Sequence, residues 1–175
     1  MLERFCQQHK IKFYTPNVDY RYFEQVINDL TKSFLNIEAE GYQVLFMGSS
    51  LGGFTSEYMA IKTQRKAIMI NPAIEPAELL VQFIGVSENF ELKQPYDWTQ
   101  AHCDQYRFYE NALKQASVKS ISRTILLDMA DEFIDSFKTQ QKYQQFTEII
   151  AYEGGSHSFE HIEDALSVIE KVIYT

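Results

Sequence analysis

Apolar residues recur every three or four positions in several segments of the chain, which is the period of a helix with one buried face. The clearest of these segments is 20–39, with Asp19 placed as its N-cap and Gly41 just past its end. The same spacing predicts further helical segments at 2–9, 54–62, 75–84, 135–145 and 162–173.

Short runs that favour strands lie between these helices, and most are continuously apolar, as expected of strands buried on both faces of a sheet. Strands are predicted at 11–15, 44–47, 67–70, 124–127 and 148–152. The first of them is stopped by Pro16, which cannot donate a ladder hydrogen bond. Because strands and helices alternate, the pattern predicts an α/β fold with three layers, in which a mostly parallel sheet carries helices on both faces.

The length of the chain suits a single domain spanning residues 1–175, because domains cluster near about 100–150 residues. Apolar residues make up 45% of the chain and charged residues 23%, a globular mix that argues against intrinsic disorder. Segment 85–117 interrupts the alternation and mixes aromatic residues with many polar ones. We interpret it as a helical or irregular, cap-like excursion from the one domain.

The charge balance argues against some partners and compartments. Lys and Arg number 16 against 24 Asp and Glu, a net charge of −8, and there is no basic block. Nucleic acid and anionic membrane surfaces are therefore not expected as partners. No apolar run approaches the roughly 20 residues of a membrane span, and the N-terminus lacks an apolar signal region, so a cytoplasmic location is predicted. Cys6 and Cys103 form no CxxC motif and are predicted to be buried free thiols.

Residues 48–52, Gly-Ser-Ser-Leu-Gly, match the pattern GxSxG. They follow an apolar strand and open a helix, which is the strand–turn–helix setting of a nucleophile elbow. In such a turn the serine is strained, and small flanking residues let strand and helix approach each other, so Ser50 is the predicted nucleophile. The alternative is a glycine-rich turn that binds a phosphate, although the usual phosphate-binding glycine motifs are absent.

A serine hydroxyl needs a base near neutral pH, and the chain has four histidines. His157 lies in a glycine-rich turn, 153–159, between the last predicted strand and the last helix, which fits the chain order Ser, Asp, His. The alternative for His157 is a role in capping its loop. His157 and His161 also form HxxxH, but residue 158 is Ser rather than Glu, so no metalloprotease-type metal site is expected.

The third member of such a triad is a carboxylate that accepts the N–H of the histidine Nδ1. The strand at 124–127 is followed by three candidates, Asp128, Asp131 and Asp135. Asp135 is more simply a helix N-cap. Asp131 has a loop position from which a carboxylate reaches the loop of a neighbouring strand, so we assign Asp131 as the acid and keep Asp128 as the main alternative.

Several motifs together resemble the YqiA-like bacterial esterases, which are small members of the α/β-hydrolase superfamily. They are Gly-Ser-Ser-Leu-Gly-Gly-Phe from residue 48, Asn-Pro-Ala from 71 with Pro-Ala-Glu-Leu-Leu from 76, Ala-Asp-Glu-Phe-Ile-Asp from 130, and Glu-Gly-Gly-Ser-His-Ser-Phe from 153. The resemblance runs in the family's order over nearly the whole chain. It implies an α/β-hydrolase-like fold and hydrolysis of carboxylic esters or of thioesters such as acyl-CoA. It also implies Ser50 as nucleophile, Asp131 as acid and His157 as base.

The chain departs from this family at its start. Members open with a hydrophobic strand ending in His-Gly-Phe, placed before the segment that aligns with Met1 and central in the sheet. The loop after that strand supplies one of two backbone N–H donors to the oxyanion hole, and Leu51, the residue after the nucleophile, supplies the other. Losing one donor typically costs about 10²–10³ in rate, so we expect either a true start upstream of Met1 or weakened catalysis.

The same departure affects the predicted sheet. Without a central strand, segment 11–15 is expected to pair directly with 44–47, to pair with another chain in a homodimer, or to leave two sheet edges open.

The sequence thus favours a serine esterase that cleaves a small-molecule ester or thioester through Ser50, His157 and Asp131 and an acyl-enzyme, with Leu51 in the oxyanion hole and no metal or organic cofactor. A second hypothesis is a catalytically impaired α/β-hydrolase relative that acts as a binding or scaffold protein. A third is a phosphate- or nucleotide-binding module, which predicts an anion bound at the turn after Gly48 and no ester turnover.

Overall fold

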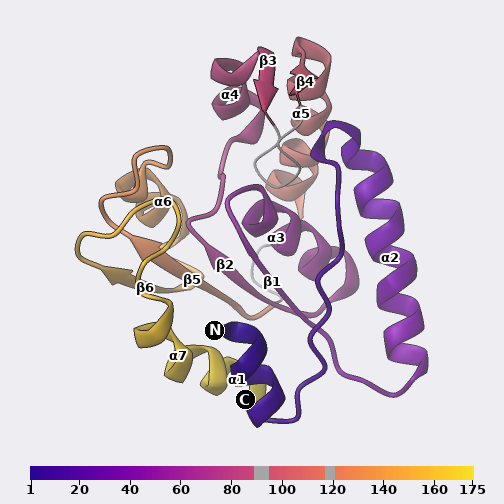
Figure 1. The fold of residues 1–175 in the computed structure, drawn as a ribbon, viewed down its shortest axis with the longest axis vertical. Coiled ribbons are helices and arrows are strands. Elements are labelled where there is room, and N and C mark those ends of the chain that lie inside the picture. Colours follow the sequence, from indigo (N-terminus) through magenta and orange to yellow (C-terminus); the bar gives the residue numbers. More distant parts are fainter. Residues whose placement is uncertain (89–94, 117–120) are drawn as a thin grey trace.

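The computed structural model describes residues 1–88, 95–116 and 121–175 (Figure 1). Its central sheet has four parallel strands in the order β1–β2–β5–β6. Their bounds are β1 Leu45–Ser49, β2 Lys66–Ile70, β5 Arg123–Asp128 and β6 Glu148–Tyr152. Because all four strands run in the same direction, the loops that follow them meet at one edge of the sheet, where ligands bind in open α/β sheets.

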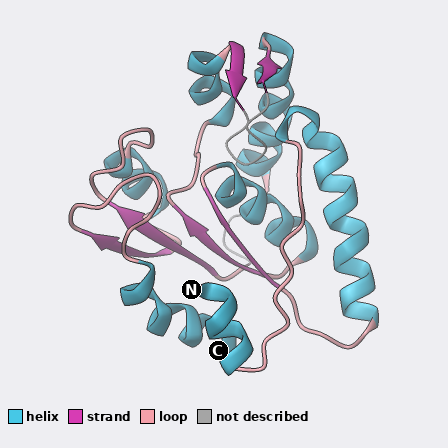
Figure 2. Ribbon diagram, viewed as in Figure 1, coloured by secondary structure: helices cyan, strands magenta, loops and turns pink. Residues whose placement is uncertain are grey.

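Helices connect and cover these strands, and a small antiparallel hairpin lies apart from the sheet (Figure 2). The helices are α1 Leu2–Gln8, α2 Phe23–Ala39, α3 Leu51–Thr63, α4 Pro76–Leu79, α5 Gln100–Gln115, α6 Ser136–Tyr143 and α7 Ile162–Tyr174. A short 3₁₀ turn, η1 Tyr20–Tyr22, precedes α2, and a second, η2 Leu80–Phe83, follows α4. The hairpin consists of β3 Gly85–Glu88 and β4 Pro95–Trp98. None of the helices in the described ranges is long and apolar enough to cross a membrane.

Side chains alternate between the two faces of the sheet and thereby bind a helical layer on each face. Ile68 and Ile70 pack against α1 and α7, which lie side by side near the two termini (Figure 1). Ala67 and Met69, the alternate residues of β2, pack against α3 and α6 on the opposite face. The predicted three-layer α/β fold with a mostly parallel sheet is confirmed.

A second cluster of aromatic side chains joins α2, α3 and α5. Phe23 packs on Phe54, Tyr106 and Tyr109 with ring centroids 5.7, 4.6 and 4.7 Å away. The Tyr106 hydroxyl donates to the carbonyl of Tyr20 at 2.8 Å, so this buried ring is also satisfied as a polar group. Segment 85–117 therefore contributes a helix that is anchored to the body of the molecule, while residues 89–94 and 117 of that segment lie outside the described part.

The strand predicted at 11–15 is wrong, because residues 11–19 carry no strand. Phe13 and Tyr14 are 45% and 54% exposed, so the segment has no apolar face to bury in a sheet. It is tied to α2 instead: Lys12 pairs with Glu40 at 2.6 Å, and Tyr14 hydrogen-bonds Ser33 at 3.3 Å. Within the described ranges β1 pairs only with β2, so the expected direct pairing of 11–15 with 44–47 does not form, and β1 is an edge strand of the sheet.

The other predicted elements are present, with small shifts at their ends. The 20–39 segment begins as a 3₁₀ turn, and Asp19 caps it by accepting the Arg21 N–H at 3.1 Å. Asp135 caps α6 by accepting the Lys138 N–H, as predicted. Cys6 and Cys103 are buried free thiols, which confirms that prediction.

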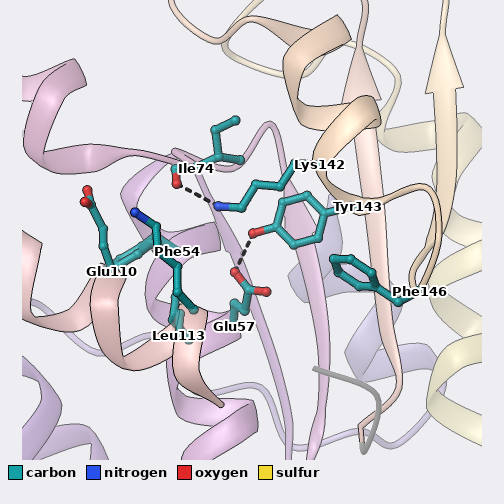
Figure 3. A pocket seen from close by; sticks show the side chains of 9 residues that line it. Phe54, Glu57, Ile74, Glu110, Leu113, Lys142, Tyr143 and Phe146 are labelled. Atoms are coloured by element: carbon teal, nitrogen blue, oxygen red, sulfur yellow. Dashed lines mark hydrogen bonds between the residues drawn. The ribbon is translucent and has the colours of Figure 1, made fainter. Parts of the chain in front are cut away.

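A buried ion pair between Glu57 and Arg123 lies where α3, β5 and α6 meet. Glu57 also lines a cavity of about 80 Å³, together with Lys142 and Tyr143 (Figure 3). Glu57 is 4% exposed, and one of its oxygens accepts from the Arg123 guanidinium at 2.8 Å. Its other oxygen accepts from the Tyr143 hydroxyl at 2.6 Å, and burial together with this carboxylate raises the pKa of Tyr143. Lys142 donates to the carbonyl of Ile74 across the cavity, and burial lowers the pKa of its ammonium group.

Replacing Glu57 by Gln is expected to lower the free energy of unfolding by about 3 kcal/mol, because the Arg123 guanidinium then faces a neutral amide inside the protein. Urea unfolding measures this loss. The matched control is Glu38→Gln, which breaks the more exposed pair with Arg65 and is expected to cost less than about 1 kcal/mol. Equal losses of unfolding free energy in the two variants would contradict the expectation that breaking the buried ion pair costs more than breaking the exposed one.

Candidate active site

Ser50 occupies the sharp turn between β1 and α3. Its backbone has φ 55° and ψ −119°, a conformation that is sterically unfavourable for a residue with a Cβ atom. Hydrogen bonds to the end of β2 and the loop after it hold it there: the Ser50 N–H donates to the Ile70 carbonyl at 3.0 Å, and the Ser50 carbonyl accepts from the Ala73 N–H at 3.0 Å. The end of β2 and the loop after it thus hold Ser50 in its strained backbone conformation.

The small residues around Ser50 are required by close backbone approaches. A Cβ atom on Gly48 would lie 2.4 Å from the backbone carbon and oxygen of Gly52. A Cβ atom on Gly53 would lie 2.9 Å from the Cβ of Pro72. For Gly48 this is the steric reason that the sequence suggested, because it lets β1 and α3 approach closely enough to form the elbow, whereas a Cβ atom on Gly52, the second glycine of GxSxG, would meet only the Tyr20 hydroxyl at 3.5 Å.

His157 and Asp131 meet at the end of the sheet where the strands finish, the same end that holds Ser50. The imidazole Nδ1 lies 2.8 Å from Asp131 Oδ2. The Asp131 side chain is fully buried, and that of His157 is 25% exposed. The other carboxylate oxygen of Asp131 accepts the backbone N–H groups of Phe133 and Ile134, each at 2.8 Å. The carboxylate therefore has one oxygen fixed by its own loop and one aimed at the imidazole.

Two further side chains surround His157. Glu132 accepts the His157 backbone N–H at 3.0 Å, and this hydrogen bond lowers the pKa of Glu132. The ring of Phe133 contacts the imidazole edge-on with centroids 5.2 Å apart, and the ring of Phe83 lies 6.1 Å beyond it. Phe83 and Phe133 are 38% and 46% exposed, so an aromatic surface adjoins the histidine.

Asp128, the alternative acid, contacts a different histidine. Its Oδ1 lies 2.7 Å from Nδ1 of His161, the N-cap residue of α7. Its Oδ2 accepts the backbone N–H groups of Ser156 at 3.2 Å and Glu160 at 2.7 Å. The described residues thus place two carboxylate–imidazole pairs next to each other here, and of the two aspartates it is Asp131 that faces His157.

Asn71 links the loops that carry these side chains, and the sequence analysis did not identify this role. It is fully buried at the end of β2 with φ 39°. Its Nδ2 donates to the Ser156 carbonyl at 3.0 Å, and its Oδ1 accepts from the Asp128 N–H at 2.9 Å. An Asn-Pro pair directly after a buried strand is the signal that could have pointed to it.

The structure brings Ser50 to this edge but does not join it to His157, since no hydrogen bond connects the two among the described residues. Ser50 contacts the end of β2, and Asn71, the next residue along, contacts the His157 loop. Leu51 is the first residue of α3, where a backbone N–H lacks an intrahelical acceptor. In the described ranges no group of three or more His, Cys, Asp or Glu side chains is arranged to hold a metal ion.

Comparison with solved structures supports the fold. A monoacylglycerol lipase from Paleococcus ferrophilus superposes with a TM-score of 0.62 at 14% identity, over 86% of this chain and 75% of the lipase. The esterase domain of a Rhodothermus marinus protein gives 0.60 at 13% identity, over 83% and 66%. An alpha-beta serine hydrolase homologue from Coxiella burnetii gives 0.53 at 15% identity, over 94% and 64%. At these identities the likeness concerns the fold, which is that of the α/β-hydrolases.

The family is established by sequence. The model of an uncharacterised protein family, UPF0227, the family of YqiA-like proteins, matches residues 1–173 and so covers all four motifs noted above. The resemblance to this family is confirmed, and the chain belongs to UPF0227.

Proposed function

We propose that this protein is a serine esterase that cleaves carboxylic esters or thioesters. The observation that carries the proposal is the 2.8 Å contact between Asp131 and His157 at the sheet edge that also holds the strained Ser50 turn. A carboxylate that accepts the Nδ1 proton leaves Nε2 of the imidazole free to act as a base. The α/β-hydrolase fold and the chain order Ser50, Asp131, His157 agree with this assignment.

In the proposed reaction, the Ser50 hydroxyl attacks the substrate carbonyl carbon while His157 Nε2 takes the hydroxyl proton. Asp131 stabilises the imidazolium that forms, and the Leu51 N–H donates to the developing oxyanion. The tetrahedral intermediate expels the alcohol or thiol, which receives the proton from His157. A water molecule, deprotonated by His157, then hydrolyses the acyl-enzyme and regenerates Ser50.

The surroundings of His157 favour substrates with an apolar portion. The partly exposed ring of Phe133 contacts the imidazole, and the ring of Phe83 lies next to Phe133. Apolar groups of a substrate gain free energy when they leave water to cover such rings. No charged group is required for this contact, so neutral esters with an acyl or aryl group are suitable first substrates.

Labelling with a fluorophosphonate probe tests the proposal, because phosphonylation requires an activated serine. We expect one probe molecule per chain, located on Ser50 by peptide mass spectrometry, and no label on the Ser50→Ala variant. Turnover of p-nitrophenyl acetate should be lost in the same variant. Absence of label on a folded wild-type chain would support the binding or scaffold hypothesis, and a phosphate bound at the turn after Gly48 without turnover would support the anion-binding one.

A further inference from the structure

We infer that Asp128 and His161 form a second carboxylate–imidazole pair whose role is to position the loop that carries His157. The catalytic consequence of this inference rests on the proposed function, whereas the geometry does not. Asp128 is the last residue of β5 and is fully buried, and His161 is the N-cap residue of α7. Neither belongs to the proposed triad.

The Asp128 carboxylate holds the His157 loop on both sides of the histidine. Its Oδ2 accepts the N–H of Ser156, the residue before His157, and the N–H of Glu160, three residues after it. The backbone of the loop also lies close to this carboxylate, since a Cβ atom on Gly155 would lie 1.9 Å from Asp128 Oδ2. The loop therefore lies directly on the carboxylate, with no room for a side chain at Gly155.

The backbone of Asp128 also holds the loop that carries Asp131, the acid of the proposed triad. Its carbonyl accepts the Asp131 N–H at 3.3 Å and the Ser136 hydroxyl at 3.0 Å. One residue thus anchors Asp131 through its main chain and the His157 loop through its side chain. Its position sets the spacing between the two groups that must stay about 2.8 Å apart for His157 to keep its orientation.

His161 fixes the direction of the Asp128 carboxylate. Its Nδ1 lies 2.7 Å from Asp128 Oδ1, which leaves Oδ2 for the two loop amides. The imidazole also stacks on the Tyr152 ring, at a centroid distance of 5.0 Å and an interplanar angle of 9°. A buried carboxylate with its full set of hydrogen bonds is rigid, and one that loses a partner is free to turn away from the loop.

Two substitutions of His161 separate the hydrogen bond from the packing of the ring. His161→Phe keeps a ring to stack on Tyr152 but removes the donor to Asp128. His161→Asn places an amide N–H near the position of Nδ1 and keeps that donor. With p-nitrophenyl acetate, we expect His161→Phe to lower kcat by about 10- to 100-fold with KM nearly unchanged, because small displacements of a catalytic group have effects of this order. His161→Asn should retain kcat within about threefold.

The matched control is His9→Phe. His9 also pairs with a carboxylate, Glu170 of α7 at 3.3 Å, but away from the His157 loop, so kcat should not change. A second measurement does not depend on activity: exchange of the Ser156 and Glu160 amide protons, followed by NMR, should be at least about tenfold faster in His161→Phe than in the wild type. Unchanged exchange would overturn the inference, as would faster exchange with an unchanged Ser50-dependent kcat. Turnover that does not need Ser50 would overturn the proposed function alone, and the exchange rates would then decide the inference.

Discussion

Asp131→Asn is expected to lower kcat for ester hydrolysis by about 10⁴-fold while the protein stays folded. The Phe133 and Ile134 N–H groups need an acceptor, so they will hold the one remaining carbonyl oxygen of the new side chain. Its NH₂ group is thereby directed at His157 Nδ1, which must then accept rather than donate. In that tautomer Nε2 carries the proton and cannot take one from Ser50.

The comparison of two aspartates makes this test decisive. Asp128→Asn is expected to be less damaging to kcat than Asp131→Asn, because Asp128 contacts His161 and backbone amides rather than His157. Asp135→Asn serves as the control, since Asn also accepts the Lys138 N–H as an N-cap, and it should leave kcat unchanged. A larger loss in Asp128→Asn than in Asp131→Asn would overturn the assignment of the acid.

The parts of the fold that the sequence predicts well are those specified by local patterns. The runs at 67–70 and 124–127 are buried and the run at 44–47 is half-buried at the edge of the sheet, so continuous apolar residues identify all three as strands of a parallel sheet. The elbow is similarly local, because the approach of β1 to α3 requires a glycine at position 48. The chain order of Ser50, Asp131 and His157 added a topological constraint that placed all three at one edge of the sheet.

The features that the sequence did not predict depend on contacts between distant segments. The 11–15 segment has residues with strand propensity, yet it is held by Lys12 and Tyr14 against α2 rather than by a neighbouring strand. The pairing of Asp128 with His161 joins the end of β5 to the start of α7, and no short-range pattern distinguishes it from a pairing with His157. Three aspartates lie within the eight residues 128–135, at the end of β5 and after it, and only the directions of their side chains distinguish the helix cap, the acid of the triad and the loop anchor.

Gly48→Ala is expected to destabilise the protein by about 4 kcal/mol or more and to abolish esterase activity, which places it among the most damaging single substitutions. The added methyl group would lie 2.4 Å from backbone atoms of Gly52, and backbone cannot move aside as a flexible side chain can. Relief of the clash requires α3 to move away from β1. That movement would break the hydrogen bonds by which Ile70 and Ala73 hold Ser50 in its strained turn.

Gly52→Ala is the matched control, because it changes the other glycine of the same motif. A Cβ atom there would meet only the Tyr20 hydroxyl, at 3.5 Å, which is ordinary contact. Gly52 lies in the first turn of α3, where Ala is favoured over Gly, so its substitution should leave the free energy of unfolding unchanged or raise it by about 0.5 kcal/mol. Urea unfolding and fluorophosphonate labelling of both variants measure the contrast. If Gly48→Ala were as stable and as reactive as Gly52→Ala, the close approach of β1 and α3 would not be what holds Ser50 in place.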